Sequence, residues 1–186
     1  MINRRNFIKQ SIGSGILVSL SNFPLRAFVD DPHITKLTIL HTNDVHSRID
    51  PFPMDGSRNQ GLGGAAKRAT LINQIRSETN NVLLLDAGDI FQGTPYFNFF
   101  GGELELKLMS EMGYDGATIG NHDFDGGMDG LVKQLPHASF PMINSNYNFS
   151  DTVLHNKTVP YKIFKKDGLK IGVFGLGIEL FGLVPD

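Results

Sequence analysis

The sequence has no cysteine among its 186 residues, and it has no surplus of positive charge. Without cysteine there is no disulfide, no thiolate metal site, no iron–sulfur cluster and no cysteine nucleophile. The 17 Lys and Arg residues are balanced by 19 Asp and Glu residues, which gives a formal net charge of −2. We therefore expect no nucleic-acid polymer as a partner, and any anionic ligand must find its positive charge locally.

A long hydrophobic run is also lacking. A helix that crosses a bilayer needs about 20 apolar residues, whereas the N-terminal stretch NRRNFIKQSIGSGILVSLSNF is interrupted by Ser and Gly. Arg4 and Arg5 precede the apolar part, and the order Arg-Arg-Asn-Phe-Ile-Lys resembles the twin-arginine export pattern of arginine-arginine-x-phenylalanine-leucine-lysine.

We therefore assign residues 1–29 to an export signal and linker, with Ala27 as the best cleavage site. This assignment makes the twin-arginine export machinery a partner. It places the mature protein in the periplasm or outside a bacterial cell, with no stable membrane span. A basic N-terminal tail or a helix that lies on the membrane is the alternative.

The remaining residues, 30–186, alternate short apolar runs with longer helical patterns, which is typical of one layered α/β domain. The expected strands are 37–41, 82–85, 117–119, 140–144, 161–164 and 169–176. Helices are expected after Gly64, over 102–112 and near 127–134. Ala65, Leu71, Ile72 and Ile75 can share one face of the first helix. The second has Leu104, Leu108 and Met112 at four-residue spacing, with Gly113 as its stop. We predict a mixed β-sheet flanked by helices.

Polar side chains follow three of these strands. Asp44 and His46 come after the first strand, and Asp86 and Asp89 after the second. The third strand is followed by Asn121, His122, Asp123 and Asp125. Because the carboxyl ends of strands in an open α/β sheet meet where ligands bind, these clusters can converge.

The three clusters together provide carboxylate, imidazole and amide ligands, a set suited to Zn²⁺, Mn²⁺ or Fe. Two such ions about 3.5–4 Å apart can hold a phosphoryl group and activate water. Taken alone, the first cluster is more often a turn than a ligand pair, the second is mainly a loop, and the third could be a turn that caps a helix. Their joint placement favours a metal site.

The stretches ILHTNDVHSRI, LLLDAGDIFQGTPYFNFF, MGYDGATIGNHDFD and FPMINSN resemble successive motifs of the calcineurin-like metallophosphoesterases. The resemblance is to the exported branch of 5′-nucleotidases and 2′,3′-cyclic phosphodiesterases, and it extends over 36–186. It implies a four-layer sandwich of which this chain is the N-terminal, truncated half. It also implies hydrolysis of nucleotides or other small phosphate esters with two divalent ions, such as Zn²⁺ or Mn²⁺.

The resemblance also implies roles for individual residues. Asp44 and His46 would bind the first metal, Asp89 would bridge both ions, and Asn121 would bind the second. His122 would stand beside the phosphate, oriented by Asp125. We interpret Asp86 as a carboxylate that structures its loop.

The family takes further histidine ligands and a substrate-binding domain from later motifs, which do not occur in these 186 residues. An exported metal-binding fragment without activity is therefore the alternative to a phosphohydrolase. A third alternative, a purely structural secreted domain, would not explain why three polar clusters follow the strands.

Overall fold

The protein is described here from a computed structural model that covers residues 34–184, so the expected export signal in residues 1–29 lies outside the described part. The chain divides into two units, Met1–Lys36 and Leu37–Asp186, and the helices and strands of the described residues lie in the second. Its elements are β1 (Thr38–Thr42), α2 (Ala65–Glu78), β2 (Val82–Asp86), α3 (Pro95–Phe100), α4 (Glu103–Glu111), β3 (Gly116–Ala117), η2 (His122–Phe124), α5 (Gly127–Gln134), η3 (Leu135–His137), β4 (Tyr161–Lys166) and β5 (Leu169–Phe174).

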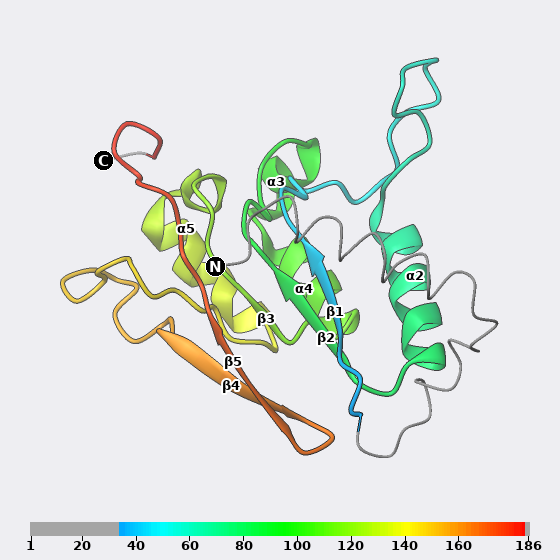
Figure 1. Ribbon diagram of the computed structural model, residues 1–186. Coiled ribbons are helices and arrows are strands. Elements are labelled where there is room, and N and C mark those ends of the chain that lie inside the picture. Colours follow the sequence, from blue (N-terminus) through cyan, green and yellow to red (C-terminus); the bar gives the residue numbers. More distant parts are fainter. Residues whose placement is uncertain (1–33, 185–186) are drawn as a thin grey trace, which may run out of the picture. The chain divides into compact units, whose positions relative to one another are not determined.

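The central feature is a parallel sheet in the order β1-β2-β3 (Figure 1). Thr38 lies opposite Val82, and Leu85 lies opposite Gly116. The middle strand β2, with the sequence VLLLD, is buried almost throughout, as expected of a continuous apolar run between two neighbours. Because the strands run parallel, their carboxyl ends meet at one edge, which is where the predicted ligands follow.

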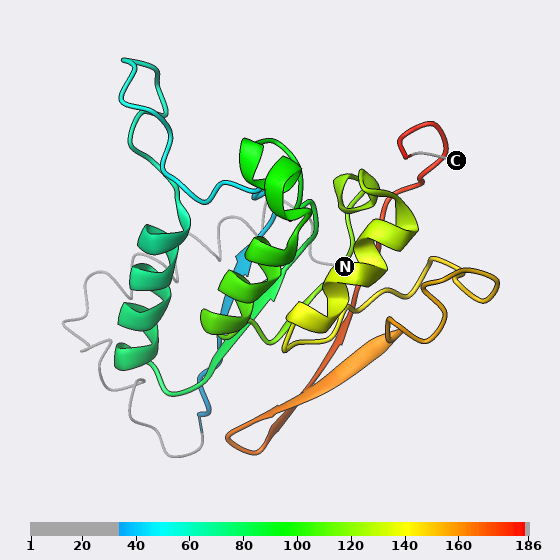
Figure 2. The ribbon, with the colours of Figure 1, turned by 180° about the vertical axis from the view of Figure 1, so that it is seen from behind.

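The helices α2, α4 and α5 cover one face of this sheet, as the views from the two sides show (Figures 1 and 2). Leu84 of β2 joins Leu106 of α4 and Leu131 of α5 in one hydrophobic core. On β1 the exposure alternates, so that Leu40 packs against this core while Ile39, on the other face, remains 55% exposed. Within residues 34–184 no helix has both the length and the apolar character needed to cross a membrane.

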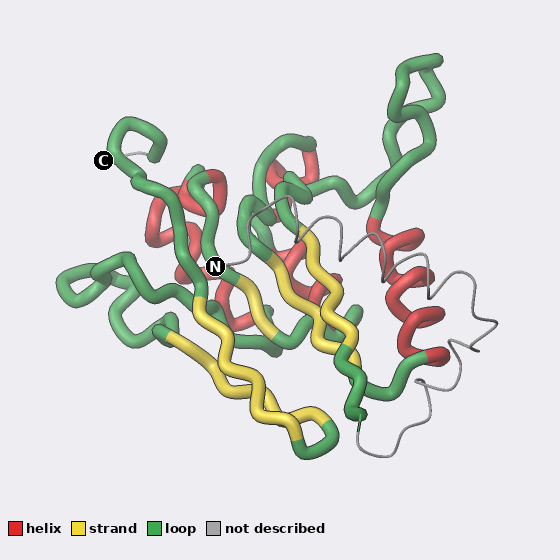
Figure 3. The backbone as a smooth tube through the Cα atoms, in the orientation of Figure 1, coloured by secondary structure: helices red, strands yellow, loops and turns green. Residues whose placement is uncertain are grey.

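Strands β4 and β5 form a separate antiparallel hairpin (Figure 3). Lys166 pairs with Leu169, and the two residues between them, Asp167 and Gly168, have φ angles of 44° and 78°. Positive φ at both positions is the signature of the type I′ turn that suits a two-residue hairpin. The α/β fold class is confirmed, although the parallel and antiparallel strands belong to two sheets.

Several sequence predictions about details of the elements were wrong. Leu71 is 57% exposed, because the buried face of α2 follows the seven-residue spacing from Ala65 to Ile72. Helix α4 buries Leu106 and Met109 rather than Leu104 and Leu108, which are only half-buried. The strand expected at 117–119 is the shorter β3, and that at 140–144 is reduced to isolated bridges at Met142 and Ile143.

Helix α3 was not predicted. Its sequence PYFNFF is rich in aromatic residues, which favour strands over helices. The helix nevertheless begins with Pro95 at its first position, where a missing N–H costs nothing. It ends at Gly101, whose φ of 61° is the left-handed cap that glycine adopts readily.

Candidate metal centre

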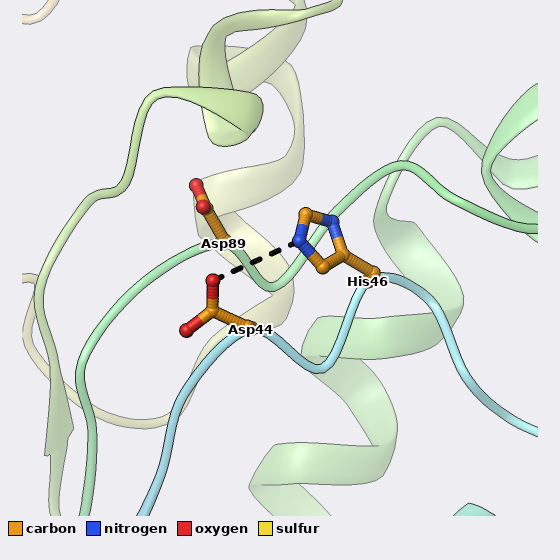
Figure 4. A group of neighbouring side chains, drawn as sticks. All are labelled: Asp44, His46 and Asp89. Carbon is orange, nitrogen blue, oxygen red and sulfur yellow. Dashed lines mark ion pairs between the residues drawn. The ribbon is translucent and has the colours of Figure 1, made fainter. Parts of the chain in front are cut away.

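Three of the predicted ligands come together at the carboxyl edge of the sheet. One ligand atom from each of Asp44, His46 and Asp89 lies within 4.8 Å of the other two. Asp44 and His46 belong to the loop after β1, and Asp89 to the loop after β2, and Figure 4 shows the three side chains gathered around one point. His46 Nε2 is 3.9 Å from Asp44 Oδ1. The neighbouring Asn43 side chain donates a hydrogen bond to the other oxygen of Asp44.

All three residues have backbones in the left-handed region. The φ angles are 51° at Asp44, 49° at His46 and 56° at Asp89. This conformation is uncommon for residues other than glycine and is found preferentially at functional sites. The surrounding structure must therefore hold these loops in place.

Backbone hydrogen bonds between the two loops provide part of that support. The N–H of Asp44 donates to the carbonyl of Gly88 at 3.0 Å, and the N–H of His46 donates to the carbonyl of Asp89 at 3.0 Å. At Gly120 an added Cβ would collide with the carboxylate and backbone of Asp89, so this position requires glycine. The close approach brings the loop after β3 against the loop after β2.

Asp123 is the main organiser of these loops. Its side chain is 1% exposed and accepts four backbone N–H groups at 2.8–3.1 Å, from Asp89, Ile90, Phe91 and Gly120. Burial raises the pKa of Asp123 to about 7, although the backbone donors from Gly120 and Phe91 oppose the shift. Asp123 therefore holds the backbone of the loop that contains Asp89 in place through these hydrogen bonds.

Asp86 has the contacts of a carboxylate that structures its own loop. One oxygen accepts the Thr42 hydroxyl at 2.5 Å and the other accepts the N–H of Gly88 at 2.9 Å. Burial raises the pKa of Asp86 to about 6, against the opposing effect of these two hydrogen bonds. Asp86 is not among the carboxylates whose ligand atoms cluster at the edge of the sheet.

Asn121 lies beside the cluster. It shares with Asp44 and Asp89 the lining of a cavity of about 320 Å³. Part of its wall comes from Leu176, Gly177 and Ile178, beyond β5. Asn146 holds this wall in place, because its amide group donates to the carbonyl of Gly177 at 2.7 Å and accepts the N–H of the same residue at 2.9 Å.

His122 and Asp125 form a pair at the rim of the site. His122 Nδ1 lies 3.0 Å from Asp125 Oδ2, and this hydrogen bond raises the pKa of His122 above its ordinary value. The N–H of His122 donates to Asp89 Oδ1 at 2.9 Å. The rings of His46 and His122 meet edge to face with centroids 5.0 Å apart. His122 is thus joined to the cluster through both its backbone and its ring.

Sequence reasoning did not identify Asp123 as the organiser of the loops, nor two arginines, Arg48 and Arg68, that line a cavity next to Asp44 and His46. A buried carboxylate that accepts backbone N–H groups has no periodic signature. The arginines stand 20 residues apart on different elements, so only the fold brings them together.

The donor set fits a divalent transition metal. Two carboxylates and an imidazole are harder than thiolates and match the preferences of Zn²⁺, Mn²⁺ and Fe²⁺. The three groups are partly exposed, so an ion can reach them, and their loops are fixed by buried hydrogen bonds. Asn121 adds an amide oxygen on the wall of the shared cavity.

Comparison with known proteins agrees with this chemistry. The chain is 43% identical over 147 residues to the snake venom 5′-nucleotidase of Gloydius brevicauda, covering 75% of this chain and 25% of that protein. It is 38% identical over 185 residues to the 5′-nucleotidase of Vibrio parahaemolyticus, covering 96% of this chain and 32% of that protein. The chain therefore spans between a quarter and a third of the length of these relatives.

Solved structures show the same relationship. A 5′-nucleotidase precursor from Thermus thermophilus superposes with a TM-score of 0.70 at 35% identity, over 76% of this chain and 28% of that one. The NAD nucleotidase of Haemophilus influenzae gives a TM-score of 0.69 at 37% identity, over 76% and 26%. Residues 37–177 match the family described as calcineurin-like phosphoesterase. The chain therefore belongs to the calcineurin-like phosphoesterases, metal-dependent enzymes that hydrolyse phosphate esters.

Proposed function

We propose that this chain carries the first part of a 5′-nucleotidase centre, which releases phosphate from nucleotides with two divalent ions. The observation that carries the proposal is the convergence of Asp44, His46 and Asp89, with ligand atoms within 4.8 Å of one another. The chain's similarity to 5′-nucleotidases supports a nucleotide as the substrate.

In this proposal Asp44 and His46 would hold one ion, Asn121 would hold the other, and Asp89 would be a ligand to both. When bound, such ions would supply positive charge for the phosphate oxygens and would favour deprotonation of water as the nucleophile. The protein's part is to present the carboxylates in one fixed geometry. Asp123 contributes by clamping the backbone of the Asp89 loop.

His122 would act on the substrate directly. The hydrogen bond between Asp125 and Nδ1 leaves Nε2 of His122 free to face the phosphate. Because this bond favours the protonated imidazole, Nε2 can donate a hydrogen bond to a phosphate oxygen or a proton to the leaving alkoxide. Asp125 would orient the ring without touching the substrate.

The test is phosphate release from AMP by the purified chain with Mn²⁺ or Zn²⁺, beside Asp89→Asn. Metal-dependent release that disappears in the variant is the expected result. A folded chain that binds Mn²⁺ but releases no phosphate would instead support the alternative, a metal-binding fragment without activity. Absence of Mn²⁺ binding in calorimetry would contradict both.

We further propose that the protein is exported from a bacterial cell through the twin-arginine machinery. The support is the order of residues around Arg4 and Arg5. Replacing both arginines by lysine keeps the charge and should retain the protein in the cytoplasm, as cell fractionation would reveal. Unchanged export of the double variant would contradict the proposal.

A further inference from the structure

Three side chains in or near the strands of the parallel sheet form a chain of hydrogen bonds. Thr42 is the last residue of β1, Asp86 is the last residue of β2, and Tyr114 lies two residues before β3. The Thr42 hydroxyl donates to Asp86 Oδ2 at 2.5 Å and lies 2.8 Å from the Tyr114 hydroxyl. The other oxygen of Asp86 accepts the N–H of Gly88 at 2.9 Å. The chain of hydrogen bonds therefore runs from the hydrophobic core to the loop that contains Asp89.

The chemistry of the three groups fixes the direction of these hydrogen bonds. A hydroxyl has one proton, and the Thr42 proton goes to the carboxylate of Asp86, which can only accept when it is ionised. Tyr114 must therefore donate its own proton to the oxygen of Thr42. Burial raises the pKa of Tyr114, so its hydroxyl keeps the proton that this contact needs. The Tyr114 hydroxyl thus holds the Thr42 hydroxyl in the orientation that serves Asp86.

Gly88 connects this chain of hydrogen bonds to the loops that contain the ligands. Its N–H donates to Asp86, and its carbonyl accepts the N–H of Asp44 at 3.0 Å. Its φ of 97° suits glycine, and an added Cβ would lie 2.6 Å from the backbone nitrogen of Gly120. Gly88 is therefore packed between the loops after β1 and β3, and Asp89 follows it directly. A shift of the Asp86 carboxylate would displace the backbone next to both Asp44 and Asp89.

A purely structural role in the core is the competing explanation for Tyr114. Its side chain is 4% exposed, and its ring packs against that of Phe140 with the centroids 6.1 Å apart. An apolar ring would fill the same space, whereas a buried hydroxyl needs a hydrogen-bond partner, which here is Thr42. Replacing Tyr114 by phenylalanine therefore separates the hydrogen bond from the packing of the ring.

We propose that Tyr114 is a positioning residue for the metal centre, which acts through the hydroxyl of Thr42 and the carboxylate of Asp86. Side chains behind the direct ligands of a metal ion set its affinity, because they fix the orientation of those ligands. Here the two hydroxyls hold Asp86, and Asp86 holds the backbone between the two ligand loops. The inference rests on the proposed function, because it needs Asp44 and Asp89 to bind an ion.

The experiment is calorimetric titration of the intact chain with Mn²⁺ after removal of single hydroxyl groups. Tyr114→Phe and Thr42→Val should each weaken Mn²⁺ binding roughly threefold to fivefold, less than the loss of about tenfold or more that is typical of partners in direct contact with a ligand. Thr42→Ser keeps the hydroxyl and should bind Mn²⁺ as the parent chain does. Tyr161→Phe is the matched control, because it removes the same hydroxyl from a side chain that is 62% exposed. Circular dichroism checks the fold of each variant.

The double variant with Tyr114→Phe and Thr42→Val distinguishes positioning from packing alone. If Tyr114 acts through Thr42, the double variant should bind Mn²⁺ no more weakly than Thr42→Val does. Losses that multiply would show that the two hydroxyls act independently, which overturns the proposal. A loss in Thr42→Ser as large as that in Thr42→Val would assign the effect to packing and overturn it as well.

Failure of the metal centre itself would look different. Absence of Mn²⁺ binding by the folded parent chain would overturn the proposed function, and this inference with it. Mn²⁺ binding that is lost in Asp89→Asn, but is the same in Tyr114→Phe as in Tyr161→Phe, would overturn only the role of Tyr114.

Discussion

The carboxylates near the candidate site fall into two groups with opposite surroundings. Asp86 and Asp123 are 4% and 1% exposed, and their oxygens accept hydrogen bonds from the loops above them. Asp44 is exposed and Asp89 half-buried, and their ligand atoms cluster with that of His46. Residues that shape the loops are buried and satisfied, whereas residues that can bind an ion are accessible.

The buried carboxylates help to hold the backbone of the metal-binding loops in a strained conformation. Positive φ angles at Asp44, His46 and Asp89 each cost free energy, on the order of 1 kcal/mol. The buried hydrogen bonds of Asp123 offset that cost, because breaking them would leave several donors without partners. The inner carboxylates, Asp86 and Asp123, therefore contribute to the stability of the fold. The outer ones, Asp44 and Asp89, should contribute to ligand binding.

The largest effect is expected for Asp123→Ala. The change would leave four backbone N–H groups without their acceptor and should lower the free energy of unfolding by about 3–5 kcal/mol. Urea denaturation would measure the loss. Asp151→Ala, at an exposed position, is the control and should stay within about 0.5 kcal/mol of the parent chain. Equal stability of the two variants would refute the organising role of Asp123.

The next effect concerns metal binding. Asp89→Asn should weaken Mn²⁺ binding about 100-fold, because it removes a ligand shared by both proposed ions. Asp86→Asn should weaken it less than about tenfold, since Asp86 acts only through its loop. Calorimetric titration of both variants gives the comparison. If Asp86→Asn proved as damaging as Asp89→Asn, the division into inner and outer carboxylates would be wrong.

A smaller effect should appear in the pH dependence of stability without metal. The folded pKa of Asp86, about 6, lies above the ordinary 3.8, so the folded chain holds this proton more tightly than the unfolded chain. The resulting stability is complete below the ordinary pKa and is lost as the pH rises through about 6. The loss is at most about 3 kcal/mol, since the pKa differs by roughly two units between the folded and unfolded chain. Thermal melts should show a flatter profile for Asp86→Asn, and parallel profiles would contradict the assignment.

The smallest expected effect is a change in the pKa of His122. The hydrogen bond that His122 Nδ1 donates to the Asp125 carboxylate is the main cause of the raised pKa of His122, so Asp125→Asn should lower that pKa toward the ordinary value. Proton NMR titration of the imidazole would show the shift. Asp129→Asn, an exposed control on α5, should leave the His122 titration unchanged. An unaltered pKa in Asp125→Asn would mean that Asp125 does not orient the ring.

Much of the fold could be predicted because its signals are local. The apolar run of β2, the stop at Gly113 and the hairpin turn at Asp167 and Gly168 depend on nearby residues, and the structure confirmed all three. The buried faces of α2 and α4 were predicted less well. Which apolar residue is buried depends on where the sheet lies against the helix, and apolar residues such as Leu71 can remain exposed.

The candidate ligand types, and their placement after three strands, could be predicted from the sequence, and these strands run parallel and so end at one edge. Which of these side chains lie close together depends on the tertiary structure. It separated Asp86 from Asp89, buried Asp123 against the loops that follow β2 and β3, and brought Arg48 and Arg68 to one cavity. The physical reason is that burial and long-range hydrogen bonds depend on how loops distant in sequence pack together.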